Sequence, residues 1–171
     1  DDIADEIIAK YGETLDSDSE HFRTFTEEKI FDGIKSTLKS LRIEFDLFSQ
    51  EQTFYDNGAI DNVLKNLEEL SLSYKKDGAI WFKTSSLGKE EDKVLVKSTG
   101  EPTYRLPDIA YHIDKVDRGF DLIVDIFGAD HIETYPDVLL GLKALGKKID
   151  HIKVVIHQFV TLKKNNKVVK M

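Results

Sequence analysis

The sequence predicts an α/β fold in which a parallel sheet with its helices is interrupted by a small antiparallel insertion. One observation is a near-continuous apolar run from Leu122 to Phe127, bounded by Gly119 and Gly128. Such a run is typical of a strand that is covered on both faces, as in a parallel sheet. Helical periodicity comes before and after this strand. Finally, Lys76-Asp77-Gly78 separates two short β-runs, which predicts a hairpin.

The other elements follow from the spacing of apolar residues along the chain. Helical spacing predicts helices over residues 1–11, 20–41 (with a candidate break near Thr26), 59–70, 108–118 and 135–146. Alternation predicts a strand over residues 43–47, and apolar runs predict strands over 121–127 and 151–162. Antiparallel strands are predicted within residues 71–98. Asn165-Asn166 is a predicted turn. The phenylalanines of residues 20–41 are expected in the core.

Composition limits the classes of protein to which the chain can belong. Its 171 residues, 40% of them hydrophobic, suit one domain or part of a larger protein. There is no cysteine, which excludes disulfides and cysteine-bound zinc. The net charge of −8 argues against broad electrostatic capture of nucleic acid. No apolar run is long enough to span a membrane, and the acidic start lacks signal-peptide features, so we expect a cytoplasmic protein without membrane attachment.

The tetrad Gly128-Ala129-Asp130-His131 follows the central predicted strand directly. Ligands of open parallel sheets bind at the carboxyl ends of the strands, which makes Asp130 and His131 candidate site residues. Gly128 lets a ligand approach the main chain closely. Asp130 suits hydrogen bonds to a ribose or a cap for the following helix, and the residues alone leave both interpretations open. Asp130, His131 and Glu133 have poor spacing for zinc, so we predict no metal site.

Tyr104 and Asp108 lie four residues apart on either side of Pro107, where a helix is predicted to begin. A carboxylate in the first turn is favourable in any helix. A fixed carboxylate beside a tyrosine also suits a planar guanidinium. The spacing alone does not decide between these two roles.

Several other polar residues have simpler interpretations. We expect His112 to be a partly buried structural histidine, and Asp114 and Lys115 to form an exposed, ion-paired helix face. Ser49 and Glu51 are expected in a polar turn that follows the strand over residues 43–47.

Longer motifs add a family resemblance. The string S-x-G-x-P-T-Y-x-x-P-D-I-A-Y-H-x-D-K from Ser98, followed by R-G-F-D and G-A-D-H, resembles the catalytic domain of arginyl-tRNA synthetases, a class I family. FSQEQTFYDNG from Phe48 resembles its F-S-E-x-x-x-Y-x-x-G with Gln50 inserted, and KDGAIWF resembles its K-D-G-A-x-W. VLVKSTGEPTY has Thr99 where the family usually has Asp, and the final Val-Lys-Met resembles the start of the K-M-S-K loop.

The resemblance implies part of a Rossmann-like parallel nucleotide-binding sheet. It implies a helical segment at residues 1–42, then a strand, a helix and the antiparallel insertion at 43–98, and the second half of the catalytic domain at 99–171. The implied arginine-binding residues are Tyr104, Asp108 and His131. The implied ATP-binding residues are Gly128, Asp130, His157, Gln158, Lys170 and Met171, and Lys170 is the implied catalytic residue.

The resemblance also implies substrates and partners. These are L-arginine, ATP with Mg²⁺ as a substrate, and tRNA(Arg), which is contacted mostly through segments outside this acidic chain; no tightly bound cofactor is expected. The H-x-G-H motif of class I synthetases is absent, and K-M-S-K is cut after its second residue, so we expect a fragment that is inactive alone. An unpaired sheet edge predicts self-association of the isolated chain.

Two other functions remain as alternatives. One is a non-catalytic ligand-binding or interaction module that derives from the same fold. The other is a nucleotide-binding α/β enzyme that adenylates a different substrate.

Overall fold

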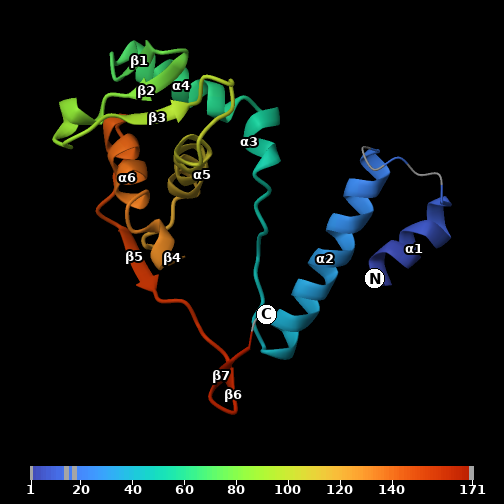
Figure 1. Cartoon of the computed structure of the whole chain (residues 1–171). Helices are drawn as coiled ribbons and strands as arrows, with labels where there is room; N and C mark the ends of the chain where they lie inside the picture. The colour runs from blue at the N-terminus through green and yellow to red at the C-terminus, as the bar shows by residue number, and fades with distance from the viewer. Residues whose placement is uncertain (1, 14–15, 17–18, 170–171) are drawn as a thin grey trace. The chain divides into compact units, whose positions relative to one another are not determined.

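The computed structural model describes residues 2–13, 16 and 19–169 (Figure 1). The chain divides into two compact units, residues 1–48 and 49–171, and each is described by itself. Lys170 and Met171, for which the sequence predicts a role at the ATP phosphates, lie outside the described residues.

Unit 1 contains two helices, α1 (Asp2–Tyr11) and α2 (Glu20–Ser40). Ser19 caps α2 by accepting a hydrogen bond from the main-chain N–H of Phe22. The candidate break near Thr26 is absent, because α2 continues without interruption through this residue. The Thr26 hydroxyl donates to the main-chain carbonyl of Phe22, one turn earlier. Tyr11 stacks on His21 and meets Phe25 edge-on, so these rings join the two helices.

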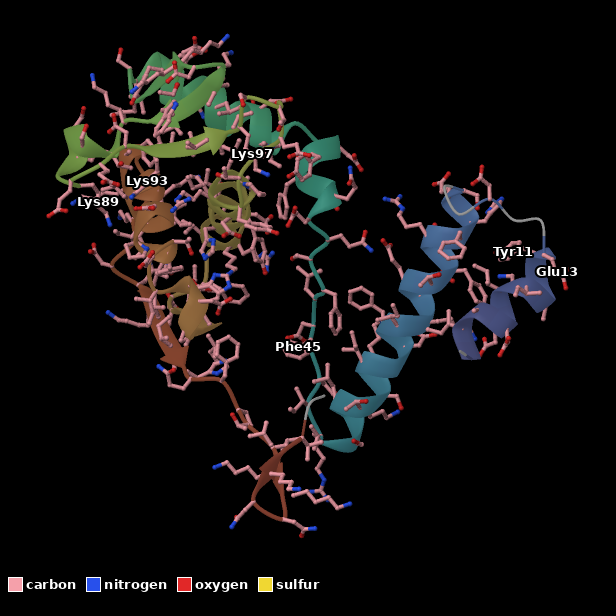
Figure 2. All side chains as sticks on the ribbon, viewed as in Figure 1. Tyr11, Glu13, Phe45, Lys89, Lys93 and Lys97 are labelled. Carbon is pink, nitrogen blue, oxygen red and sulfur yellow. The ribbon has the colours of Figure 1, made fainter. Side chains whose placement is uncertain are left out.

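The prediction of a strand over residues 43–47 is wrong. These residues are extended, but no described residue forms a ladder with them, and a strand requires a hydrogen-bonded neighbour. Phe45 (Figure 2) remains 58% exposed. The prediction that the phenylalanines of α2 lie in the core holds for Phe25, which is 7% exposed, but not for Phe22 at 38% or Phe31 at 37%.

Unit 2 contains the predicted antiparallel insertion. Its strands are β1 (Ser73–Lys76), β2 (Ala79–Phe82) and β3 (Lys93–Val96), in that order. Asp77 and Gly78 both have positive φ, 52° and 77°, as a two-residue hairpin turn requires. The sheet shares one core with α3 (Gln52–Asp56), α4 (Ala59–Glu69) and α5 (Arg105–Asp117). A short 3₁₀ helix, η1 (Thr84–Leu87), links β2 to β3.

The parallel part of unit 2 pairs β4 (Ile123–Gly128) with β5 (Ile152–His157) in register, so that Gly128 faces His157. The connection consists of η2 (Ala129–His131) and α6 (Tyr135–Ala144). Helices α5 and α6 lie between the antiparallel sheet and the parallel pair (Figure 1). The predicted α/β class is therefore confirmed.

Two details of the parallel part differ from the prediction. The last long strand ends at His157 instead of Leu162, and a small hairpin follows, with β6 (Lys163–Lys164), the turn at Asn165-Asn166 and β7 (Lys167–Val168). The expectation that β4 is covered on both faces is wrong for the part of the chain that the structure describes. Ile123 is 8% exposed, whereas Ile126 is 67% exposed, because the described helices cover one face of the strand pair.

Among the described residues, no helix is both long and apolar enough to span a bilayer.

Candidate functional site

The first part of the candidate site is a small pocket at the start of α5. The pocket has a volume of about 190 Å³ and is lined by Ser49, Glu51, Phe54, Pro107, Asp108 and Tyr111. Asp108 enters it from the first turn of α5, which begins at Arg105, three residues before the predicted start. The lining contains two carboxyl groups and two aromatic rings but no basic side chain. This chemistry suits a cationic ligand, since carboxylates pair with the charge and ring faces attract cations.

Burial raises the pKa of Asp108 above the usual range for an aspartate, while the charges of His112, His131 and Lys115 act in the opposite direction. The ionised carboxylate is therefore poorly solvated in the pocket without a ligand. A cation at this position would restore favourable interactions to that carboxylate, as an opposite charge does for any partly buried acid.

The segment around Ser49 and Glu51 is held against α5 from a distance along the chain. Arg118 Nη2 donates to Ser49 Oγ at 3.0 Å and also pairs with Asp114. The rings of Phe54 and Tyr111 lie 5.6 Å apart between their centroids. Ser49 and Glu51 thus do more than form a polar turn, because they line the pocket beside Asp108.

Tyr104 lies outside this pocket. It directly precedes α5 and is 81% exposed. The tyrosine that lines the pocket is Tyr111, which lies within α5. The structure therefore keeps Asp108 as a pocket residue and leaves the Tyr104 ring at the surface.

The second part of the candidate site is the corner where β4 and β5 end. Gly128 lies opposite His157, and Gln158 follows directly, so three of the predicted ATP residues meet at this edge. A Cβ atom on Gly128 would come within 2.5 Å of Asp130 Oδ1, so a larger residue here would displace the Asp130 side chain from its present position. His157 Nδ1 lies 3.0 Å from the carbonyl oxygen of Gln158.

Asp130 is exposed at this corner and does not cap the next helix. The residue at the N-cap of α6 is Thr134, and no side chain makes a capping hydrogen bond there. The capping interpretation of Asp130 is therefore wrong. His131 lies 3.8 Å from Asp130 Oδ2, and its ring stacks on Phe127 with centroids 4.8 Å apart.

A buried cluster of charged and polar side chains lies between α5, β4 and α6, and the sequence interpretation missed it. Its centre is Asp125, which is 4% exposed. Lys115 donates to Asp125 Oδ1 at 2.5 Å, Tyr135 donates to Oδ2 at 2.8 Å, and His112 Nε2 lies 3.2 Å from Oδ2. We call these four residues the Asp125 cluster. The signal for this cluster in the sequence is Asp125 itself, an aspartate inside an apolar strand. A carboxylate buried in such a strand requires hydrogen-bond partners from elsewhere in the fold.

The cluster changes the interpretation of two residues. His112 is structural, as expected, but it is almost fully buried, at 2% exposed. Lys115 was expected on an exposed face, and this is wrong, because its side chain is 16% exposed and pairs with Asp125. Asp114 does form the expected ion pair near the surface, with Arg118.

Burial by itself would raise the pKa of Asp125, but hydrogen bonds from His112, Lys115 and Tyr135 outweigh it and hold that pKa well below its usual range. Burial, followed by the hydrogen bond to Asp125, raises the pKa of the Tyr135 hydroxyl. The carboxylate is thus ionised and Tyr135 is its neutral donor at neutral pH.

Three lysines of the antiparallel insertion form ion pairs with nearby acids. Lys89, Lys93 and Lys97 (Figure 2) pair with Asp137, Glu91 and Glu101 at 3.4, 3.5 and 3.2 Å. No group of three or more metal-ligating side chains occurs within the portion of the chain that the structure covers.

Comparison with solved structures gives the class of protein. The fold matches an arginyl-tRNA synthetase crystal structure from Campylobacter jejuni with a TM-score of 0.84 and 31% identity, over 99% of this chain and 38% of that one. A Plasmodium falciparum arginyl-tRNA synthetase shares the fold, with a TM-score of 0.68 and 18% identity over 92% of this chain and 29% of its own. The fold is thus that of a class I synthetase catalytic domain.

The family follows from the sequence comparisons. The family model described as tRNA synthetases class I (R), catalytic domain, matches residues 1–170, and the chain belongs to this arginyl-tRNA synthetase family. It is 50% identical to an arginine–tRNA ligase from Desulfotalea psychrophila and 48% identical to one from Salinibacter ruber, each over 99% of this chain. The chain spans 31% of the length of either relative.

Proposed function

We propose that this chain forms part of an arginine–tRNA ligase. In the reaction, a carboxylate oxygen of L-arginine attacks the α-phosphorus of ATP and pyrophosphate leaves, which yields arginyl-adenylate. A ribose hydroxyl at the end of tRNA(Arg) then attacks the arginyl carbonyl, and AMP leaves. Membership of the family supports this proposal. Because the chain spans 31% of its relatives and has no H-x-G-H motif, we propose that it is inactive by itself.

The observation that carries the proposal is the acidic, aromatic pocket around Asp108. A guanidinium needs a fixed planar partner, and a carboxylate offers two acceptors to it. Asp108 is held in the first turn of α5, inside a pocket without a basic lining residue. We assign the arginine side chain to Asp108. Tyr104 and His131 are proposed as further arginine contacts, and Tyr104 would need to turn toward the pocket from its exposed position.

We assign ATP to the corner where the parallel strands end. Gly128 allows close approach to the main chain, the exposed Asp130 suits hydrogen bonds to the ribose, and His157 and Gln158 follow the neighbouring strand toward the adenine. Lys170 and Met171 are proposed at the phosphates, where a lysine stabilises the charge that moves to pyrophosphate. Mg²⁺ would arrive with ATP. Catalysis of this kind depends mainly on positioning and electrostatic stabilisation.

The partners are proposed on the same basis. The net charge of −8 and the ion pairs of Lys89, Lys93 and Lys97 support tRNA contacts mostly through segments outside this chain. A cytoplasmic location is proposed because the reaction serves protein synthesis.

The test is arginine attachment to tRNA by the full-length protein that contains this chain, with wild type beside Asp108→Asn. The variant keeps the shape of the side chain and removes its charge. We expect the KM for arginine to rise about 100-fold or more, which is roughly 3 kcal/mol, with little change in the KM for ATP. Asp117→Asn is the matched control, because Asp117 is an acid of the same helix that pairs with Lys147 outside the pocket.

The outcomes separate the alternatives. Attachment by wild type and by Asp108→Asn with similar arginine KM values would retain the enzyme and reject the Asp108 assignment. Arginine binding by wild type without any attachment to tRNA would favour the non-catalytic module. Attachment or adenylation of another amino acid would favour an enzyme with a different substrate.

A further inference from the structure

The Asp125 cluster lies outside the pocket around Asp108, yet it contacts both parts of the candidate site. We propose that Asp125 is a positioning residue, which holds the first turn of α5, with Asp108, in place against the β4–η2 corner, with His131. This inference rests on the proposed function, because Asp108 and His131 are the proposed arginine contacts.

The link to Asp108 runs through His112. The Nδ1 atom of His112 lies 2.7 Å from the main-chain carbonyl oxygen of Asp108, and its Nε2 atom lies 3.2 Å from Asp125 Oδ2. A carbonyl oxygen only accepts hydrogen bonds, so Nδ1 carries a proton in this contact. The imidazole therefore spans the distance from Asp125 to the first turn of α5. It is 2% exposed, which leaves its ring little freedom to turn.

The link to the corner runs along β4 and through α6. The Tyr135 hydroxyl donates to Asp125 Oδ2 at 2.8 Å. The Tyr135 ring packs on Phe127 with centroids 5.0 Å apart, and Phe127 in turn stacks on His131 at 4.8 Å. One carboxylate thus contacts α5 and α6 directly, while Phe127, two residues along the same strand, supports His131.

Asp125 also contacts two side chains that act on Asp108. Lys115 and His112 both contact the Asp125 carboxylate, and both oppose the rise that burial causes in the pKa of Asp108. Without the charge of Asp125, these two side chains lose their acidic partner and their fixed positions. The expected consequence is a misplaced or less fully ionised Asp108, which weakens binding of a cationic substrate more than binding of ATP.

The test uses the full-length protein and arginine attachment to tRNA. We expect Asp125→Asn to raise the KM for arginine by about tenfold or more, while the KM for ATP and the kcat stay within about threefold of wild type. The matched control is again Asp117→Asn, which removes an acid that also pairs with a lysine, at 2.5 Å, but at the far end of α5. This control should leave all three constants within about twofold of wild type.

A milder variant keeps the proposal testable if Asp125→Asn does not fold. Tyr135→Phe removes one hydrogen bond to Asp125 and should raise the KM for arginine by about threefold or more. Tyr74→Phe is its control, because Tyr74 donates to Asp92 over the same 2.8 Å within the antiparallel insertion. This control should leave the KM for arginine unchanged.

Three results are decisive. A KM for arginine near the wild-type value in both Asp125→Asn and Tyr135→Phe would overturn the inference. Comparable increases in the KM for arginine and the KM for ATP, together with a lower kcat and a lower melting temperature, would also overturn it. That pattern indicates general destabilisation of the protein. Absence of arginine attachment by wild type would instead overturn the proposed function, so the two failures are distinguishable.

Discussion

The antiparallel insertion and the parallel strand pair of unit 2 bury their side chains to different extents. In the insertion, Phe82 and Leu95 are 0% exposed, because α4 and α5 cover the sheet. In the parallel pair, Val124 is 48% exposed and Ile126 is 67% exposed, although the opposite face packs on Leu142. Elements close in sequence thus complete the core of the insertion. The parallel pair completes only one of its faces among the described residues.

Truncation of a buried side chain in the insertion should cost much more stability than truncation of an exposed side chain in the parallel pair. Leu95→Ala in the 171-residue chain should lower the free energy of unfolding of unit 2 by about 2–5 kcal/mol, because it leaves a cavity in a fully packed core. Ile126→Ala should cost less than about 1 kcal/mol, since most of the side chain is already in solvent. Urea unfolding, monitored by circular dichroism, gives both values. Equal costs would show that the exposed face of β4 is buried in solution.

The exposed face also predicts self-association of the isolated chain. The two-stranded sheet carries three exposed apolar side chains, Val124, Ile126 and Val155. Such an apolar patch favours contact between copies of the chain. Ile126→Asp should weaken association by about tenfold in sedimentation equilibrium, roughly 1.4 kcal/mol. Leu70→Asp is a matched control, because Leu70 is 51% exposed at the end of α4, away from this face. A wild-type chain that remains monomeric over a wide concentration range would contradict the prediction.

The smallest expected effect concerns Asp108 without its ligand. Burial raises the pKa of Asp108 in the folded state, so its ionisation opposes folding at neutral pH. Asp108→Asn should therefore stabilise the chain at pH 7, by no more than about 1 kcal/mol. The advantage should begin to shrink as the pH falls through the raised folded-state pKa and should vanish below the unfolded-state pKa of about 3.9, where the wild-type carboxyl is protonated in both states. Thermal unfolding at pH 3 and pH 7 measures the difference, and a destabilised variant at pH 7 would contradict it.

Much of the fold could be predicted from short stretches of the sequence. The positive φ angles of Asp77 and Gly78, the Ser19 cap and the end of β4 at Gly128 depend on groups within a few residues of each other. The strand over residues 43–47 could not be predicted in the same way, because alternation does not supply a hydrogen-bonded neighbour.

The candidate site likewise contains residues that local sequence features place and residues that only distant contacts place. Asp108 and the Gly128–His131 tetrad could be placed from the sequence, because a helix start and a strand end are local features. The neighbours of Asp108 could not, since Ser49 is held to α5 by Arg118, 69 residues further along the chain.

The sequence by itself therefore determined most of the helices and strands of unit 2, the hairpin turn at Asp77-Gly78 and the arginyl-tRNA synthetase family. Only the tertiary structure decided which face of β4 is covered, that Glu51 shares a pocket with Asp108, and how Asp125 is satisfied. The physical reason is that main-chain conformation depends largely on neighbouring residues. A buried charge instead requires donors, and here the fold brings them to Asp125 from two different helices.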